Sequence, residues 1–137
     1  MTKRIIKNNG GEGYVDICVG VVVFVIILVV GINIFSFITL KADMEHIADE
    51  LLDTATYTGC FGTDYKNVRQ ELKNEYFDFS DSPGANAYFN VTYKRVQLGE
   101  IMWVEISKDA YIRGIGGFKI PITLTVKRSG ISEKYWK

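Results

Sequence analysis

The sequence predicts an α+β fold in which a long N-terminal helix, half of it in a membrane, packs on a small antiparallel sheet. Three observations predict this fold. Residues 17–40 contain no formal charge, apolar residues then recur at a helical period, and the last third of the chain alternates apolar with polar residues. A period of 3.6 is typical of a helix and a period of two is typical of a strand. The helical part therefore precedes the sheet, which is the order expected of the α+β class.

The first element is a transmembrane helix over residues 17–40, which read ICVGVVVFVIILVVGINIFSFITL. At about 1.5 Å per residue this run spans roughly 36 Å, more than the roughly 30 Å of a bilayer's hydrocarbon core. It is apolar all the way round, whereas a helix of a soluble core carries a polar face. In lipid every backbone group must bond within the segment, which selects a helix even for Val and Ile.

The flanks of this run predict its orientation. Basic residues within positions 3–7 precede it, and carboxylates dominate residues 43–53 after it. Because positive flanks stay in the cytoplasm, residues 1–16 are expected inside and residues 41–137 outside, as an extracytoplasmic head. A cleaved secretory signal is the alternative, but its apolar region is usually about 7–15 residues and ends at a small-residue site. We therefore expect a single-pass protein of the cell membrane.

The helix is expected to continue beyond the membrane. Its apolar positions repeat every three or four residues between carboxylates: Leu40, Met44, Ile47, Leu51 and Ala55. Such a stripe predicts that the head or a neighbouring molecule covers one face of the helix. Gly59 and Gly62 are the predicted stops.

A second helix and a turn are expected next. Thr63 and Asp64 predict its N-cap. Its buried face is predicted to comprise Tyr65, Val68, Leu72 and Tyr76. Residues 80–84 (SDSPG) form a cluster typical of a turn.

Three alternating segments predict strands. They are Phe89, Val91 and Tyr93; Met102, Val104 and Ile106; and Phe118, Ile120, Ile122, Leu124 and Val126. Gly99 and the glycine-rich residues 114–117 fall where connections belong. One-sided alternation favours an antiparallel sheet with its apolar face on a helix. Pro121 predicts an edge position or a bulge for the last strand.

Charge is divided along the chain although the formal net charge is zero. Residues 41–81 hold 10 acidic and 4 basic side chains, and residues 82–137 hold 4 acidic and 9 basic ones. The two parts either complement each other, within a subunit or between subunits, or are solvated faces of opposite sign. A neutral total charge does not favour nucleic acid as a partner.

The residues before the apolar run read NGGEGYVD at positions 9–16. They resemble the class III leader of type IV pilin-like proteins, and within that family the TadE-like pseudopilins of tight-adherence pilus systems. They are also similar to a group of Gram-positive single-pass membrane proteins that begin with Gly-Glu-Gly-Tyr. The resemblance implies that a prepilin peptidase cuts between Gly11 and Glu12, and that Asp16, fifth in the processed chain, sets the stagger between subunits during assembly.

The resemblance also implies a pilin-like fold and a non-catalytic function. The chain would be a pilin-like or pseudopilin subunit of a type IV or Tad-like pilus or a related envelope assembly, with other pilin-like subunits as partners. The alternative is an uncleaved bitopic membrane protein whose head binds another envelope or conjugation component.

The role of Asp16 can be argued physically as well. A carboxylate at the edge of hydrocarbon is costly unless it is paired. Cleavage would leave a positively charged α-amino group on Glu12, which could pair with Asp16 of an adjacent helix. Alternatively, both carboxylates lie in the headgroup layer, where they suit the positive end of the helix dipole.

Other residues of the apolar run predict helix packing. Gly20 and Gly31 would allow another helix to approach closely, and Asn33 could hydrogen-bond across helices. Cys18 lies in the expected membrane span and Cys60 beyond the end of the extracellular helix. A continuous helix between them would hold the two too far apart for a disulfide within the chain.

Catalytic chemistry finds no support in the sequence. His46, with Asp43 and Glu50 on one helix face, is a conceivable metal site, but a lone histidine among exposed carboxylates is far more often solvated. The sequence has no GxSxG motif, and its glycine-rich segment precedes a strand pattern rather than a helix that would bind phosphate. Aromatic and basic residues interleave at 93–95 and 135–137, a weak signal for single-stranded nucleic acid. We expect no enzyme activity, metal, cofactor, nucleic acid or small-molecule substrate.

Overall fold

The computed structural model describes residues 12–114 and 116–137. It contains helices α1 (Glu12–Thr58) and α2 (Thr63–Glu75) and strands β1 (Ser80–Ala85), β2 (Ile101–Arg113) and β3 (Lys119–Ile131). The predicted α+β class is confirmed, because one long apolar helix packs on a small antiparallel sheet with a short helix beside it. Residues 1–11 of the predicted leader, including Gly11 of the expected cleavage site, lie outside the described residues.

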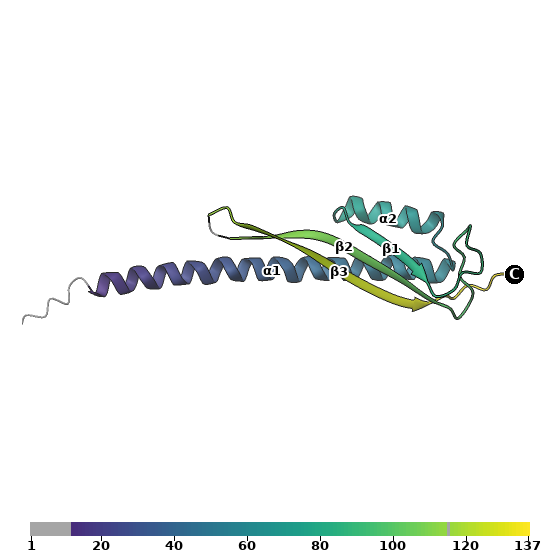
Figure 1. Ribbon diagram of the computed structural model, residues 1–137, viewed down its shortest axis with the longest axis horizontal. Coiled ribbons are helices and arrows are strands. Elements are labelled where there is room, and N and C mark those ends of the chain that lie inside the picture. The colour runs from purple at the N-terminus through teal and green to yellow at the C-terminus, as the bar shows by residue number, and fades with distance from the viewer. Residues whose placement is uncertain (1–11, 115) are drawn as a thin grey trace, which may run out of the picture.

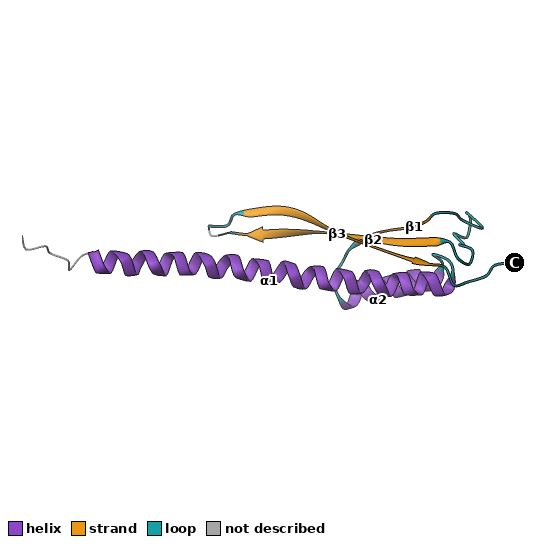
Figure 2. Cartoon of the chain, turned by 90° about the horizontal axis from the view of Figure 1, so that it is seen from below, coloured by secondary structure: helices purple, strands orange, loops and turns teal. Residues whose placement is uncertain are grey.

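The elements form two layers. The sheet has the order β1-β2-β3, and α1 and α2 lie together on one of its faces (Figure 2). The N-terminal part of α1 projects well beyond the sheet, and the C-terminus lies at the opposite end of the molecule (Figure 1). Most of the head therefore packs on the C-terminal part of α1, and the hairpin of β2 and β3 reaches further along the helix (Figure 1).

The predicted helical stripe and its stop are confirmed. Met44, Ile47, Leu51 and Ala55 are fully buried. The helix ends where Gly59, at a φ of 65°, donates its N–H to the Ala55 carbonyl over 2.8 Å. A Cβ on Gly59 would also lie 2.4 Å from the Cβ of Lys134, so this helix end has room only for glycine.

The predicted buried face of α2 is confirmed, but its cap is not. Tyr65 and Leu72 are buried, and the other two predicted positions pack against the core. The helix begins at Thr63 with Gly62 as N-cap and without a side-chain cap hydrogen bond. Thr63 is already helical and therefore cannot cap, while Asp64 stands in the first turn, where its charge suits the helix dipole.

The predicted turn at residues 80–84 was wrong, because this segment is strand β1. It pairs antiparallel with β2 from Ser80↔Ser107 to Ala85↔Met102. An edge strand tolerates Pro83 because one side of its backbone needs no partner. Gly84 lies under the indole of Trp103, where an added Cβ would come within 2.6 Å of the ring. Glycine is common in turns, but here Gly84 allows the backbone of β1 to lie close to the Trp103 indole.

The strand predicted around residues 89–93 was also wrong. The segment forms turns held by isolated bridges from Arg95 to Asn90 and to Cys60. Phe89, Val91 and Tyr93 are exposed. The Asn90 side chain accepts the backbone N–H of Tyr93 over 3.1 Å and closes a local turn. Residues 102–107 of β2 pair with β1 on one side and with β3 on the other, so this central stretch leaves no position for a further strand.

The two remaining predicted strands are confirmed as one long hairpin. Met102, Val104 and Ile106 are buried on the helix-facing side of β2. The register runs from Ile101↔Ile131 to Arg113↔Lys119. The predicted glycine connection closes it, with a φ of 86° at Gly116 and 79° at Gly117. Pro121 lies on β3, an edge strand as expected.

The hairpin of β2 and β3 extends beyond the end of β1. Because β1 pairs only with residues 102–107 of β2, residues 108–113 and their partners 119–124 continue as a two-stranded ribbon. We call this part the hairpin ribbon and its end, residues 111–114 and 118–121, the hairpin tip. Figure 1 shows the ribbon running beside α1 toward the helix N-terminus.

Candidate functional site

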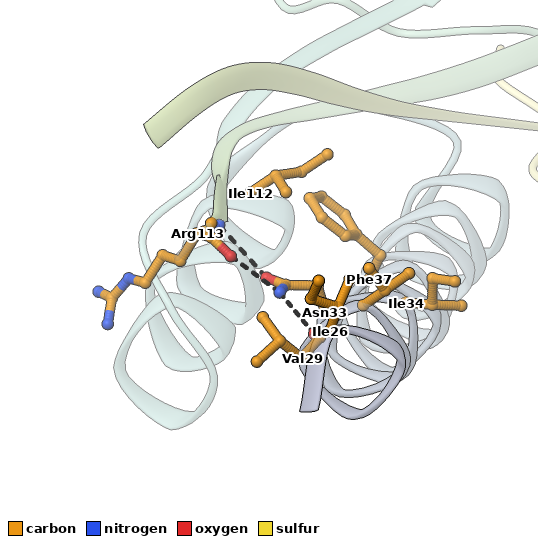
Figure 3. Close-up of a pocket in the computed structure, with 9 residues that line it drawn as sticks. Ile26, Val29, Asn33, Ile34, Phe37, Ile112 and Arg113 are labelled. Atoms are coloured by element: carbon orange, nitrogen blue, oxygen red, sulfur yellow. Dashed lines mark hydrogen bonds between the residues drawn. The ribbon is translucent and has the colours of Figure 1, made fainter. Parts of the chain in front are cut away.

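The Asn33 side chain joins the hairpin tip to α1 by hydrogen bonds. Its Nδ2 donates to the Arg113 carbonyl over 2.9 Å, and its Oδ1 accepts the Arg113 N–H over 3.2 Å (Figure 3). Nδ2 also donates to the carbonyl of Val29 over 2.8 Å. The amide thus pairs with both backbone groups of Arg113, much as a residue of a neighbouring strand would.

An apolar groove lies between α1 and the tip. It has a volume of about 410 Å³ and is lined by Ile26, Val29, Val30, Asn33, Ile34, Phe37, Ile112, Arg113 and Gly114. Figure 3 shows the guanidinium of Arg113 pointing away from the groove. The groove therefore offers hydrocarbon on almost all sides, because the polar groups of Asn33 are occupied by the chain itself.

The ribbon covers only one narrow stripe of the helix. Between residues 13 and 42, the half-buried positions are Val29, Asn33, Phe37 and Leu40, and all the others are exposed. Spacings of three and four place these residues on one face. We call residues 13–40 of α1 the anchor segment, and most of its circumference is uncovered.

The anchor segment meets the length and composition requirements of a membrane span. Among the described residues, one helix, Gly13–Thr58, is long and apolar enough to cross a membrane. Its most apolar 18-residue stretch has a mean hydropathy of 3.2, and none of it is buried. These features are consistent with a membrane anchor.

The predicted packing and cleavage residues are distributed along this segment. Glu12 is the first residue of α1, and Asp16 is exposed in its second turn. A Cβ added at Gly20 or Gly31 would meet nothing within 4 Å. Their roles in cleavage, subunit stagger and packing stay predictions.

Asn33, in contrast, has partners within the chain. The sequence indicated that it could hydrogen-bond across helices, and that role stays a prediction. Within the chain its amide bonds to Val29 and Arg113. The sequence carried one signal for this joint, a lone amide within an apolar run. It could not reveal that a strand 80 positions away would supply the partner.

The two segments of interleaved aromatic and basic residues meet at the other end of the head. The guanidinium carbon of Arg95 lies 4.4 Å from the ring centre of Trp136 and 5.1 Å from that of Tyr93. Trp136 also donates its indole N–H to the Gly59 carbonyl and exchanges two hydrogen bonds with the Gln97 side chain. Arg95, Gln97 and Trp136 therefore pack together at the C-terminal end of α1.

Charges of opposite sign meet within the subunit. Arg128 of β3 lies 3.2 Å from carboxylate oxygens of both Glu45 and Asp49 on α1. The acidic helix and basic sheet therefore complement each other at this contact, which favours the first of the two interpretations of the charge division.

A second polar contact joins α2 to β1. Only 3% of the Asp81 side chain is exposed. One of its oxygens accepts the Tyr65 hydroxyl over 3.0 Å, and Arg69 lies against the other without linear hydrogen-bond geometry. Burial, followed by the charge of Asp81, raises the pKa of Tyr65 well above its ordinary value. The phenol therefore stays a donor at neutral pH.

The candidate metal residues do not converge. His46 packs edge to face on Tyr76, with ring centres 6.0 Å apart. Within residues 12–114 and 116–137, no group of three or more His, Cys, Asp or Glu side chains is placed to hold a metal ion. Cys18 is exposed and Cys60 half-buried, and both thiols are free.

One comparison with known proteins gave a match. A family model described as a domain of unknown function (DUF4320) matches residues 21–137. No curated protein and no solved structure matches the chain significantly.

Proposed function

The chain belongs to the DUF4320 family, and we propose that it is a non-catalytic, membrane-anchored assembly subunit of pilin-like or pseudopilin type. The observation that carries this proposal is the uncovered anchor segment. Between residues 17 and 32 its large apolar side chains are 45–67% exposed, except that of Val29, which is half-buried. A surface of this kind is satisfied by lipid before assembly and by neighbouring helices after it.

The remaining features fit this role. The head folds around the C-terminal part of α1 and leaves Asp16, Gly20 and Gly31 free to meet another subunit. In the proposed orientation the N-terminus is cytoplasmic and the head is extracytoplasmic, in the membrane or in a surface filament. Prepilin peptidase and other pilin-like subunits are the proposed partners, with Asp16 setting the stagger between helices.

Processing tests the proposal directly. The full chain is expressed with and without an active prepilin peptidase, and its mass and N-terminal sequence are determined. Cleavage after Gly11 would give a chain that begins at Glu12 and is lighter by roughly 1.2 kDa. Gly11→Leu should abolish this product, whereas Gly10→Leu is the matched control that should retain it.

A chain that keeps its first residues beside an active peptidase would contradict the processed-subunit proposal. The alternative would then apply, an uncleaved bitopic protein whose head binds another component of the envelope or a conjugation apparatus.

A further inference from the structure

We propose that the hairpin tip enters the membrane leaflet on the side of the head, so that the protein is anchored by a helix and a β-hairpin together. This inference rests on the proposed membrane anchor and adds a second lipid-binding element to it. The proposed occupant of the groove between α1 and the tip is the acyl chain of a phospholipid.

The depth of the tip follows from the length of the helix. A hydrocarbon core of roughly 30 Å takes about 20 helical residues. Counted from Ile17, the core ends near Ser36, which places Asn33 about 4–5 Å and Val29 about 10 Å inside it. Counted from Gly13, the core ends near Ile32, and Val29 still lies about 4–5 Å inside. Since the tip bonds to Asn33 and lines one groove with Val29, it reaches the leaflet in either case.

On the β2 side of the tip, the backbone polar groups nearest α1 have partners within the chain. Hydrocarbon tolerates non-helical backbone only where its polar groups have partners. The outward N–H and C=O of Arg113 bond to Asn33, and Gly114 donates its N–H to the Phe118 carbonyl over 2.8 Å. This explains why an amide side chain stands within the apolar run.

The side chains of the tip match the lipid boundary. Phe118 and Tyr111 are 66% and 59% exposed, and Ile120 is also exposed. Arg113 and Lys119 face each other across the strands and are exposed as well. Aromatic rings and long basic side chains are typical of the interface, where apolar parts enter the acyl region and charged ends reach phosphate groups. In water these apolar rings would remain uncovered.

The groove favours lipid over a recognised protein segment. Its polar groups, the Asn33 amide and the Arg113 backbone, are already bonded to each other, so an incoming chain would find no free partner for its own polar groups. An acyl chain has no polar groups to satisfy and can fill an apolar groove of about 410 Å³.

The test measures the depth of single side chains in nanodiscs of phosphatidylcholine and phosphatidylglycerol. In the full chain with Cys18→Ser and Cys60→Ser, one cysteine at a time replaces Phe118, Tyr111, Val25 or Ile131 and carries an environment-sensitive fluorophore. Quenching by nitroxide-labelled lipids is compared with quenching by aqueous iodide. Ile131 is the matched control, because it lies on the same hairpin at its far end and is 60% exposed.

We expect labels at Phe118 and Tyr111 to be quenched by lipids carrying shallow nitroxides and to be protected from iodide severalfold relative to Ile131. Val25 reports on the anchor itself. If Val25 is quenched by lipid while both tip labels are quenched only by iodide, the tip lies in water and this inference is overturned, although the anchor stands. If iodide reaches Val25, the membrane anchor fails and the hairpin proposal fails with it.

Discussion

At the scale of single residues, the buried Asp81 carboxylate depends on its donor from α2. It is almost fully enclosed, and the Tyr65 hydroxyl is its hydrogen-bond donor from α2. A buried charged acceptor that loses a donor costs the free energy of desolvation without compensation.

Tyr65→Phe should therefore lower the free energy of unfolding by about 1–3 kcal/mol. The measurement is denaturant unfolding of the full chain in detergent micelles, followed by near-ultraviolet circular dichroism. Tyr57→Phe is the control, because Tyr57 is largely exposed and its change should fall within about 0.5 kcal/mol. Equal effects of the two variants would contradict the assigned role of the bond.

Asp78 is expected to show a simple pH dependence. The hydrogen bond from Lys73 over 2.8 Å, together with its charge, lowers the pKa of Asp78. Because the folded-state pKa lies below the unfolded one, the contribution of this pair is present above the unfolded pKa and is lost as the pH falls through the folded pKa.

Lys73→Met should return the pKa of Asp78 toward its ordinary value, as measured by an NMR titration of the side-chain carboxyl carbon. The effect on stability should be small and should decrease with salt, because the Asp78 side chain is exposed. An unchanged titration curve would show that Lys73 does not set this pKa.

At the scale of elements, the joint between α1 and the hairpin ribbon depends on Asn33. Asn33→Leu keeps a side chain branched at Cγ but removes both hydrogen bonds to the backbone of Arg113. Each such bond contributes about 0.5–1.5 kcal/mol.

Hydrogen exchange of the Arg113 amide should therefore accelerate about threefold to tenfold or more in Asn33→Leu. Exchange at Met102, in the part of β2 that β1 also covers, should not change. Ser36→Leu is the matched control on the helix, because the Ser36 hydroxyl bonds to its own helix, at the Ile32 carbonyl. Unchanged exchange at Arg113 would mean that other contacts hold the tip.

The sequence predicted the elements whose periodicity came from burial. Met44, Ile47 and Leu51 recur at a helical period because the sheet covers that face of α1. Val104 and Ile106 alternate with polar residues because α1 covers that face of the sheet. The sequence-based prediction was wrong where residues typical of turns occur within a strand. Pro83 and Gly84 are typical of turns, yet they belong to an edge strand whose backbone approaches the Trp103 indole.

The joint itself was beyond local patterns. Nothing near Asn33 in the sequence shows that Arg113 will lie beside it, because that contact depends on how far the hairpin extends past β1. The same holds for Arg95, whose stacking on Trp136 requires the chain to turn back to the end of α1.

At the scale of the whole molecule, most of the surface of the anchor segment is not used by the fold of the subunit. Substitutions there can therefore change association between subunits without changing the stability of the head. Gly20 has no neighbour within 4 Å of an added Cβ, so a larger side chain there should leave the subunit's own stability unchanged. If another helix packs against it, however, the side chain holds the two backbones apart.

Gly20→Leu should therefore weaken association between subunits by about 1 kcal/mol, roughly fivefold, while unfolding of the head is unaffected. Oxidative crosslinking through Cys18 measures this association, since Cys18 is exposed on the same segment. The chain carries Cys60→Ser and is crosslinked in the membranes of the cells that express it. Val21→Leu is the control with a similar final side chain. Equal crosslinking in all three chains would place the subunit interface elsewhere.

The long-range joints also fix the order in which the protein can be made. The hydrogen bond from Asn33 cannot form until Arg113, 80 positions later, has been synthesised. The Gly59 carbonyl likewise bonds to the indole of Trp136, 77 positions later. A ribosome delivers the N-terminal part first, and a helix needs only its own neighbours to form. The apolar helix is therefore complete while the strands are still being synthesised. The head then packs on a helix that has already formed and that, in the proposed anchor, already lies in the bilayer. The contacts made by the last residues of the chain complete the fold.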